Sequence, residues 1–160
     1  MKVLGIDPGT GRMGWAIVEK LKGKESLIEC GCLETPPHTP LPIRLEKIHS
    51  FLNEIITKHK PQSASIEDLF FAKNRKTVMS VGAARGVIIL ACKQAKLDIN
   101  LYSPLQIKSS VTGYGQADKK QVQFMVQNIL KTKEIPQLDD AIDAVAVALT
   151  HLSRTPSLTI

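Results

Sequence analysis

Short apolar runs separated by glycine- and proline-rich breaks occupy the first part of the chain, a pattern typical of β-strands joined by turns. The first run covers residues 2–7, and a second over 14–19 follows the turn sequence PGTGRM. A third run over 26–34 alternates in part and ends before the proline-rich sequence TPPHTPLP. Three consecutive strands with short connections predict an antiparallel meander.

After the proline-rich sequence, the apolar residues follow a helical period. Helices are predicted over 43–60 and 76–95, from Pro104, over 119–131, and through the last apolar segment, DDAIDAVAVALTHLSR. Two short strands, SASIE and INLYS, lie between the first three of these helices. This order predicts an α/β fold in which a mixed five-stranded sheet is flanked by helices on both faces.

Length and composition fit one globular domain. The chain has 160 residues, of which 43% are hydrophobic and 22% are charged, enough to bury a substantial core. Because no linker, internal repeat or low-complexity tract divides the chain, we expect a single domain over residues 1–154 and a short tail over 155–160.

The sequence pattern argues against membrane and secretory classes. We expect no signal peptide, because the first apolar run is short. The most apolar later stretch, VGAARGVIILACK, contains Arg85 and Lys93 and therefore does not predict a transmembrane helix. The cysteines Cys30, Cys32 and Cys92 lack metal-type spacing and are expected to be small core thiols in a reducing compartment. We therefore expect a cytoplasmic protein without a membrane partner.

The formal net charge of +6 is concentrated in the middle of the chain. Residues 61–120 hold nine basic and four acidic side chains, a balance of +5, whereas residues 121–160 hold three basic and four acidic ones, a balance of −1. A concentrated positive charge favours a polyanionic partner, of which a nucleic acid is the commonest. A solvated lysine-rich surface explains this feature equally well.

Acidic residues occur at unusual places in the predicted elements. Asp7 ends the first strand, Glu67 ends the fourth, and Asp140 and Asp143 share one face of the last helix. Asp139 fits a helix N-cap or a first-turn acid. If the first and fourth strands are neighbours, Asp7 and Glu67 end side by side, and the last helix can bring its first turn to the same point.

Converging carboxylates repel one another unless a cation neutralises them. Hard oxygen ligands suit Mg²⁺ or Mn²⁺, and two such ions about 4 Å apart can promote hydrolysis of a phosphodiester. Taken singly, each acid is better explained as a turn, a cap or an ion pair. Taken together, the four favour a metal site. His151 lies about 12 Å along the helix from Asp143 and is expected in the core or on the surface.

Five blocks of the sequence stand in a characteristic order: GIDPGTGRMGWAI, IEDLFFAKN, GAARGV, VTGYGQADKKQVQFMV and DDAIDAVAVALTH. In this order they resemble the RuvC family of Holliday-junction resolvases over about residues 2 to 154. The resemblance implies a ribonuclease H-like fold and a homodimer that cuts four-way DNA junctions in homologous recombination and DNA repair. It also implies two Mg²⁺ ions, which Mn²⁺ can replace, 5′-phosphate products, and the branch-migration partners RuvA and RuvB.

The resemblance assigns the catalytic and metal-binding carboxylates to Asp7, Glu67, Asp140 and Asp143. Asp140 rather than Asp139 has the family's D-x-x-D spacing to Asp143, although a shift by one residue would exchange the two.

Aromatic and basic residues surround the predicted acidic site. Two adjacent aromatics, Phe70 and Phe71, cannot both face the core from a regular strand. By resemblance, Phe70 would stack on or wedge between bases at the junction centre, whereas packing of both rings beneath the long helix is the alternative. The predicted DNA-binding set is Phe70, Lys73, Asn74, Arg75, Lys76, Lys108, Lys119 and Lys120.

Three of these lysines flank a glycine loop. Gly113 and Gly115 permit a close approach of the backbone to phosphate, and Lys119 begins a helix, where the dipole disfavours a cation unless an anion is near. The resemblance places Lys108 and Lys119 at the scissile region, while Lys120 fits a solvated surface as well.

Three alternatives are weighed against this interpretation. GIDPGT also resembles the first phosphate motif of the actin and sugar-kinase superfamily, but those proteins need two domains and a second phosphate loop. The YqgF-like family of putative RNA-processing nucleases also opens with a strand, an aspartate and a glycine-rich turn, but the IEDLFFAKN and DDAIDAVAVALTH blocks of this chain argue against it. A catalytically inactive junction-binding protein would not need all four acids. The helix pattern with Gly82 and Gly86 fits a dimer interface or packing within one subunit.

Overall fold

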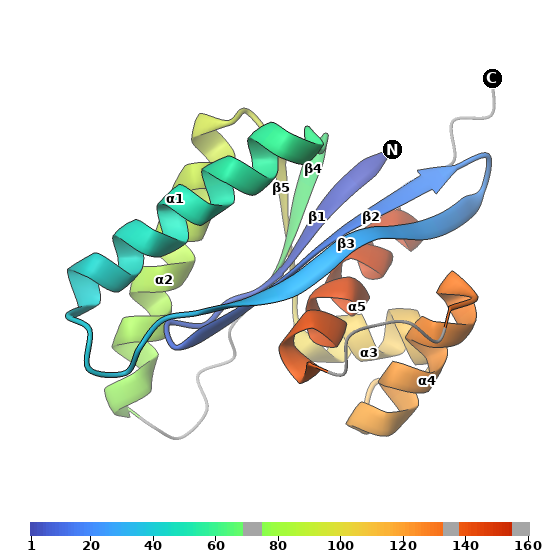
Figure 1. Ribbon diagram of the computed structural model, residues 1–160. Coiled ribbons are helices and arrows are strands. Elements are labelled where there is room, and N and C mark those ends of the chain that lie inside the picture. Colours follow the sequence, from blue (N-terminus) through green and yellow to red (C-terminus); the bar gives the residue numbers. More distant parts are fainter. Residues whose placement is uncertain (69–74, 133–137, 155–160) are drawn as a thin grey trace.

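The computed structural model describes residues 1–68, 75–132 and 138–154, without the side chains of residues 75–77. Five strands form one sheet in the order β3-β2-β1-β4-β5 (Figure 1). Their bounds are β1 Lys2–Asp7, β2 Arg12–Leu21, β3 Lys24–Glu34, β4 Ser63–Glu67 and β5 Asp98–Tyr102. The predicted meander is therefore confirmed, with β2 and β3 longer than the apolar pattern indicated.

In the described part of the chain, five helices pack on the two faces of this sheet. They are α1 Leu41–His59, α2 Arg75–Gln94, α3 Pro104–Thr112, α4 Lys119–Leu130 and α5 Asp139–Arg154. Figure 1 shows α1 and α2 on one side of the sheet and α3, α4 and α5 on the other. This arrangement confirms the predicted α/β architecture. None of the described helices is long and apolar enough to cross a membrane.

The strand directions bring two acidic strand ends to one edge of the sheet. β1 pairs antiparallel with β2 and parallel with β4, and the β1–β4 register aligns Ile6 with Ile66. The next residues in each strand are Asp7 and Glu67, at the carboxyl ends of neighbouring parallel strands. The sheet is therefore mixed, and its order alone makes these two carboxylates neighbours.

Alternation along the central strand divides the core into two apolar layers. Leu4 and Ile6 are fully buried against the α1 and α2 side, whereas Val3 belongs to the layer under α5. Almost every residue of α5 from Ala141 to Leu152 is buried, because the helix packs between the sheet and the helices α3 and α4. Asp143 is the residue of this stretch that stays partly exposed.

A close contact lets α5 lie directly on the sheet. A Cβ atom placed on Gly5 would stand 2.2 Å from the carbonyl oxygen of Ala144 and 2.8 Å from the Cβ of Ala148. No side chain fits in that space, so the glycine in β1 and the alanines in α5 together set the height of the helix above the strands. The first turn of α5 is thereby held at the sheet edge where Asp7 and Glu67 end.

Candidate active site

Four acidic side chains converge at this sheet edge. Asp7 and Glu67 come from β1 and β4, and Asp140 and Asp143 come from the first turns of α5. Burial, together with the charges of Glu67, Asp143 and Asp140, raises the pKa of Asp7 to about 8. In the absence of a metal ion, this raised pKa favours the protonated form of Asp7, which shares a hydrogen bond with Glu67.

The pKa values of Glu67 and Asp143 are also raised. Burial raises the pKa of Glu67, and Lys108 and Lys119 lower it only in part. Burial also raises the pKa of Asp143, again against the lowering effect of Lys119. Raised carboxyl pKa values show that the fully ionised cluster is unfavourable without more positive charge. Hard oxygen donors that need a cation fit a divalent ion such as Mg²⁺.

Two organic cations already pair with the acids of α5. Arg12 donates a hydrogen bond from Nη2 to Oδ2 of Asp140, and Nζ of Lys119 lies 3.7 Å from Oδ2 of Asp143. Within the described ranges, no three aspartate, glutamate, histidine or cysteine side chains lie together so that they could hold one metal ion as they stand. A metal must therefore compete with Arg12 and Lys119 for these two carboxylates.

The structure distinguishes the neighbouring residues Asp139 and Asp140, which the sequence alone did not. The side chain of Asp139 is 68% exposed, whereas that of Asp140 is 25% exposed. The charges of Asp140 and Asp143 both raise the pKa of Asp7. Asp139 instead lies at the rim, 3.7 Å from Nζ of Lys119.

A pocket of about 170 Å³ opens beside the acids, between β4, α3, α4 and α5. Glu67 and Asp143 line it together with Lys108 and Lys119, and apolar residues such as Ile107 and Val147 form its walls. The pocket therefore presents both signs of charge around a partly dry space, which suits a phosphate group held near cations and carboxylates.

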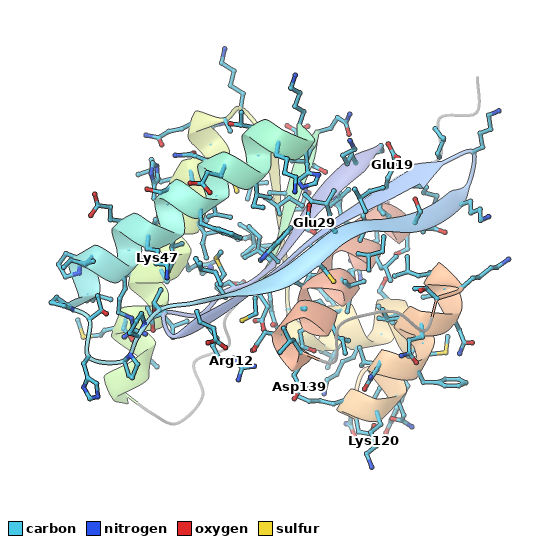
Figure 2. The ribbon with its side chains drawn as sticks, in the orientation of Figure 1. Arg12, Glu19, Glu29, Lys47, Lys120 and Asp139 are labelled. Atoms are coloured by element: carbon cyan, nitrogen blue, oxygen red, sulfur yellow. The ribbon has the colours of Figure 1, made fainter. Side chains whose placement is uncertain are left out.

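Local sequence signals explain how Lys119 reaches this place. α3 ends at Gly113, which has a φ of 77° that favours glycine. Asp118 then caps α4 with a capping box to Gln121, so Lys119 is the first residue of the helix. The unfavourable helix dipole is offset because Asp143, and to a smaller extent Asp139 and Asp140, raise the pKa of Lys119. Figure 2 shows Lys120 on the first turn of α4, where its side chain is exposed.

Part of the predicted DNA-binding set lies outside the described residues. This holds for Phe70, Lys73 and Asn74, and for the side chains of Arg75 and Lys76. Of the remaining predictions, Lys108 and Lys119 line the pocket and Lys120 does not.

His151 belongs to the core, because Nδ1 of its ring is hydrogen-bonded to the hydroxyl of Tyr102 at 2.8 Å. The prediction of core thiols holds fully for Cys92 alone. Cys32 is half-buried, and its Sγ lies 3.8 Å from Oδ2 of Asp140.

Sequence reasoning missed Arg12. The only signal was a basic residue in the turn PGTGRM between two strands, where a solvated arginine is the ordinary interpretation. Its pairing with Asp140 spans 128 positions of the chain and depends on the placement of α5.

Comparison with known proteins agrees with this geometry. Residues 3–151 match the family model described as crossover junction endodeoxyribonuclease RuvC. A crossover junction endodeoxyribonuclease RuvC from Chloroflexus aurantiacus is 48% identical over 158 residues, which cover 99% of this chain and 96% of the relative.

Solved structures match over nearly the whole chain. The Thermus thermophilus RuvC structure has a TM-score of 0.86 at 33% identity and covers 96% of this chain and 94% of its own. The structure of T. thermophilus RuvC in complex with Holliday junction substrate has a TM-score of 0.87 at 30% identity with the same coverage. The fold is therefore ribonuclease H-like, as the sequence resemblance implied.

Four carboxylates at the edge of such a sheet, a family model that spans residues 3–151 and relatives that align from end to end lead to one assignment: this chain belongs to the RuvC family of crossover junction endodeoxyribonucleases.

Proposed function

We propose that this protein is a structure-specific DNA endonuclease that resolves Holliday junctions by paired symmetric nicks in homologous recombination and DNA repair. The observation that supports this most is the convergence of Asp7, Glu67, Asp140 and Asp143 beside a pocket with two lysines. The names of the relatives and the solved junction complex of T. thermophilus RuvC point to the same substrate.

The four carboxylates are proposed to hold two Mg²⁺ ions, with Mn²⁺ as a substitute. Their oxygen donors fit this role, and so do the raised pKa values of Asp7, Glu67 and Asp143. A divalent cation offsets both the burial and the neighbouring negative charges that raise the pKa of Asp7. When bound, such ions make water nucleophilic at neutral pH and neutralise charge on the phosphodiester. The expected products carry 5′-phosphate and 3′-hydroxyl ends.

The lysines of the pocket have a separate task in this proposal. Lys119 and Lys108 present ammonium groups beside Glu67 and Asp143, where the charge of a scissile phosphate grows during attack. Lys120 is proposed to contact the DNA backbone further out. Phe70 remains a predicted wedge at the junction centre, with Lys73, Asn74, Arg75 and Lys76 as predicted backbone contacts.

Paired nicks require two active sites related by a two-fold axis, so we propose a homodimer. Helix α2 has features that suit its interface. Met79 is 81% exposed and Leu90 is 52% exposed, and a Cβ atom on Gly82 or Gly86 would meet no atom within 4 Å. An apolar helix face with small residues allows close approach of a second copy. The branch-migration proteins RuvA and RuvB are the proposed partners, and the cytoplasm the proposed location.

The test uses a labelled synthetic four-way junction and a linear duplex of the same sequence, each with Mg²⁺ and with EDTA. We expect metal-dependent, symmetrically paired nicks in the junction and none in the duplex. Junction binding without nicks under all metal conditions and in several junction sequences would mean an inactive structure-binding protein. Neither binding nor nicking would contradict the proposal and direct attention to structured RNA.

A further inference from the structure

We propose that the groove between α1 and the adjoining ends of β2 and β3 is a second binding site for DNA backbone phosphates, on the far side of the catalytic acids from Lys108 and Lys119. This inference rests on the proposed nuclease function and extends it. The groove has a volume of about 410 Å³, and its charged lining residues are Arg12, Arg44, Lys47 and Glu34. Three cations against one carboxylate leave it positive.

The cations of the groove are held in place by the fold. Nε of Arg44 donates a hydrogen bond to Oγ1 of the buried Thr35 at 2.8 Å, and Nη2 lies 3.4 Å from where a Cβ on Gly11 would stand. Nζ of Lys47 donates to the backbone carbonyl of Glu34 at 3.0 Å. Because these side chains are already oriented, a phosphate ligand would immobilise little further side-chain freedom. The absence of a side chain at Gly11 keeps the Arg44 guanidinium open to the groove.

Arg12 joins this groove to the catalytic acids. Arg12 lines the groove, its guanidinium donates a hydrogen bond to Asp140, and 52% of its side chain is exposed. If Asp140 binds a metal ion, the charge of Arg12 becomes available to a neighbouring phosphate. The groove is therefore connected to the proposed catalytic acids through the side chain of Arg12.

Cations thus flank the acids on two sides. Figure 2 shows Lys47, Arg12, Asp139 and Lys120 in a row that runs from α1 across the first turn of α5 to α4. Contacts support the same order, since Arg12 pairs with Asp140 and Lys119 pairs with Asp139 and Asp143. A DNA strand that crosses a cluster of carboxylates is repelled there, and positive charge on both sides offsets the repulsion. This continuity with the active site favours DNA over an acidic protein as the occupant.

The first test changes one exposed charge in the groove. Lys47→Glu is compared with Lys24→Glu, which makes the same change in net charge at the hairpin tip between β2 and β3, at the other end of both strands from Arg12. Junction affinity is measured by fluorescence anisotropy in EDTA over a series of salt concentrations. We expect Lys47→Glu to weaken binding by about tenfold and to reduce the slope of log Kd against log salt by about 1, as loss of a phosphate contact does.

Lys47→Arg should bind like the wild type, and thermal melting should be unchanged for all three variants because both lysines are exposed. Equal effects of Lys47→Glu and Lys24→Glu on affinity and salt slope would overturn the proposal and leave the groove to another acidic partner.

The second test locates the phosphate. Single methylphosphonates, which remove one backbone charge, replace successive phosphates on each side of the scissile position. Junction affinity is measured for each methylphosphonate with the wild type and with Lys47→Ala. At the contacted phosphate, the two changes together should weaken binding less than the sum of their separate effects, which identifies that phosphate. Additive losses at every position would contradict the groove site. In that case the proposed nuclease function would still hold if the wild-type protein cuts junctions in Mg²⁺. If the wild-type protein neither binds nor cuts junctions, the proposed nuclease function itself is wrong.

Discussion

The backbone of Asp140 lies against Gly14. A Cβ atom on this glycine would be 1.9 Å from the carbonyl oxygen of Asp140 and 2.5 Å from its carbonyl carbon. Gly14 is also the β2 partner of Asp7 in the sheet. One glycine therefore fixes the distance between the first acidic residue of the site and the helix turn that supplies the third.

Gly14→Ala should push the start of α5 away from the sheet. Backbone atoms block the new methyl group, so we expect a loss of about 1–3 kcal/mol in the free energy of unfolding, the usual range for overpacking, and a larger relative loss of nuclease activity. Urea denaturation and junction nicking measure the two effects. The matched control is Gly31→Ala in β3, where the nearest atoms, at 3.1 Å, belong to the Trp15 side chain and not to the backbone of α5. Equal losses in both variants would show that contact with Asp140 is not the cause.

The two aspartates at the start of α5 should differ sharply in function. Asp140→Asn removes a proposed metal ligand, and we expect nicking to fall at least about 100-fold, because loss of a residue that only orients a ligand already costs up to about that much. Asp139→Asn changes an exposed rim side chain and should keep most of the activity. Rates of junction nicking at saturating Mg²⁺ decide between them. The reverse ranking would make Asp139 the ligand and shift the site by one residue.

Asp7→Asn should abolish cleavage and preserve junction binding, because it removes a ligand without removing a positive charge from the DNA-binding surface. Gel electrophoresis under denaturing conditions measures cleavage, and anisotropy in EDTA measures binding. Loss of both activities in a variant that melts like the wild type would undermine the assignment of Asp7 to the metal site.

Lys119 and the adjacent Lys120 form a natural pair for testing electrostatic stabilisation. Lys119 lies 3.7 Å from Asp143 and lines the pocket, whereas Lys120 is exposed outside it. Lys119→Gln should lower the nicking rate of bound junction by about 100-fold, as loss of a charge-stabilising donor does, with a smaller change in affinity. Lys120→Gln should lower affinity alone. Single-turnover rates separate these effects, and a pure affinity loss for Lys119→Gln would assign it to DNA binding only.

Without metal, stability should fall as the pH rises from about 4 to about 8. The unfolded chain releases the Asp7 proton near the ordinary value of 3.8, whereas the folded protein keeps it until a pKa of about 8, so the unfolded state gains from each rise in pH across this window. The raised pKa values of Glu67 and Asp143 act in the same direction. Thermal melting in EDTA should show a weaker fall in Asp7→Asn than in the wild type. Parallel pH profiles for both proteins would contradict the raised pKa.

Addition of Mg²⁺ should raise the melting temperature more at pH 8.5 than at pH 5.5. The metal competes with the protons that the acidic cluster retains at low pH, and fewer protons remain to be displaced at the higher pH. Mg²⁺ should have little effect on Asp7→Asn at either pH, which distinguishes site binding from a general salt effect.

Much of the fold follows from local patterns. β1 was predicted over the residues that form it, and α5 was predicted through the segment that forms it, because alternation and helical period are strong there. The strand order was not predicted, because the adjacency of β1 and β4 entered the sequence analysis only as a condition, and the structure supplies it. The tips of β2 and β3 were missed, since Lys20, Lys22 and Lys24 give that hairpin no apolar alternation and its strands are held by pairing instead.

Within the candidate site, spacing distinguished Asp140 from Asp139 only by resemblance to a family. The folded chain gives the physical distinction, because the rotation of α5 turns Asp140 toward Arg12 and Asp7 and leaves Asp139 at the rim. The groove between α1 and the ends of β2 and β3 had no sequence signal at all. In the sequence, nothing distinguishes Arg12, Arg44 and Lys47 from ordinary surface cations, and only the fold places them along one groove.

The sequence by itself determined which residues alternate, which follow a helical period and where acids end apolar strands, because these depend on neighbours along the chain. Only the tertiary structure decided which charges meet. Residues as distant as Arg12 and Asp140 share a hydrogen bond because Gly5 and Gly14 let α5 rest on the sheet without an intervening side chain. Electrostatic energies depend on separation in space. The raised pKa of Asp7 therefore depends on that packing, and the positive groove depends on the fold that brings Arg12, Arg44 and Lys47 together.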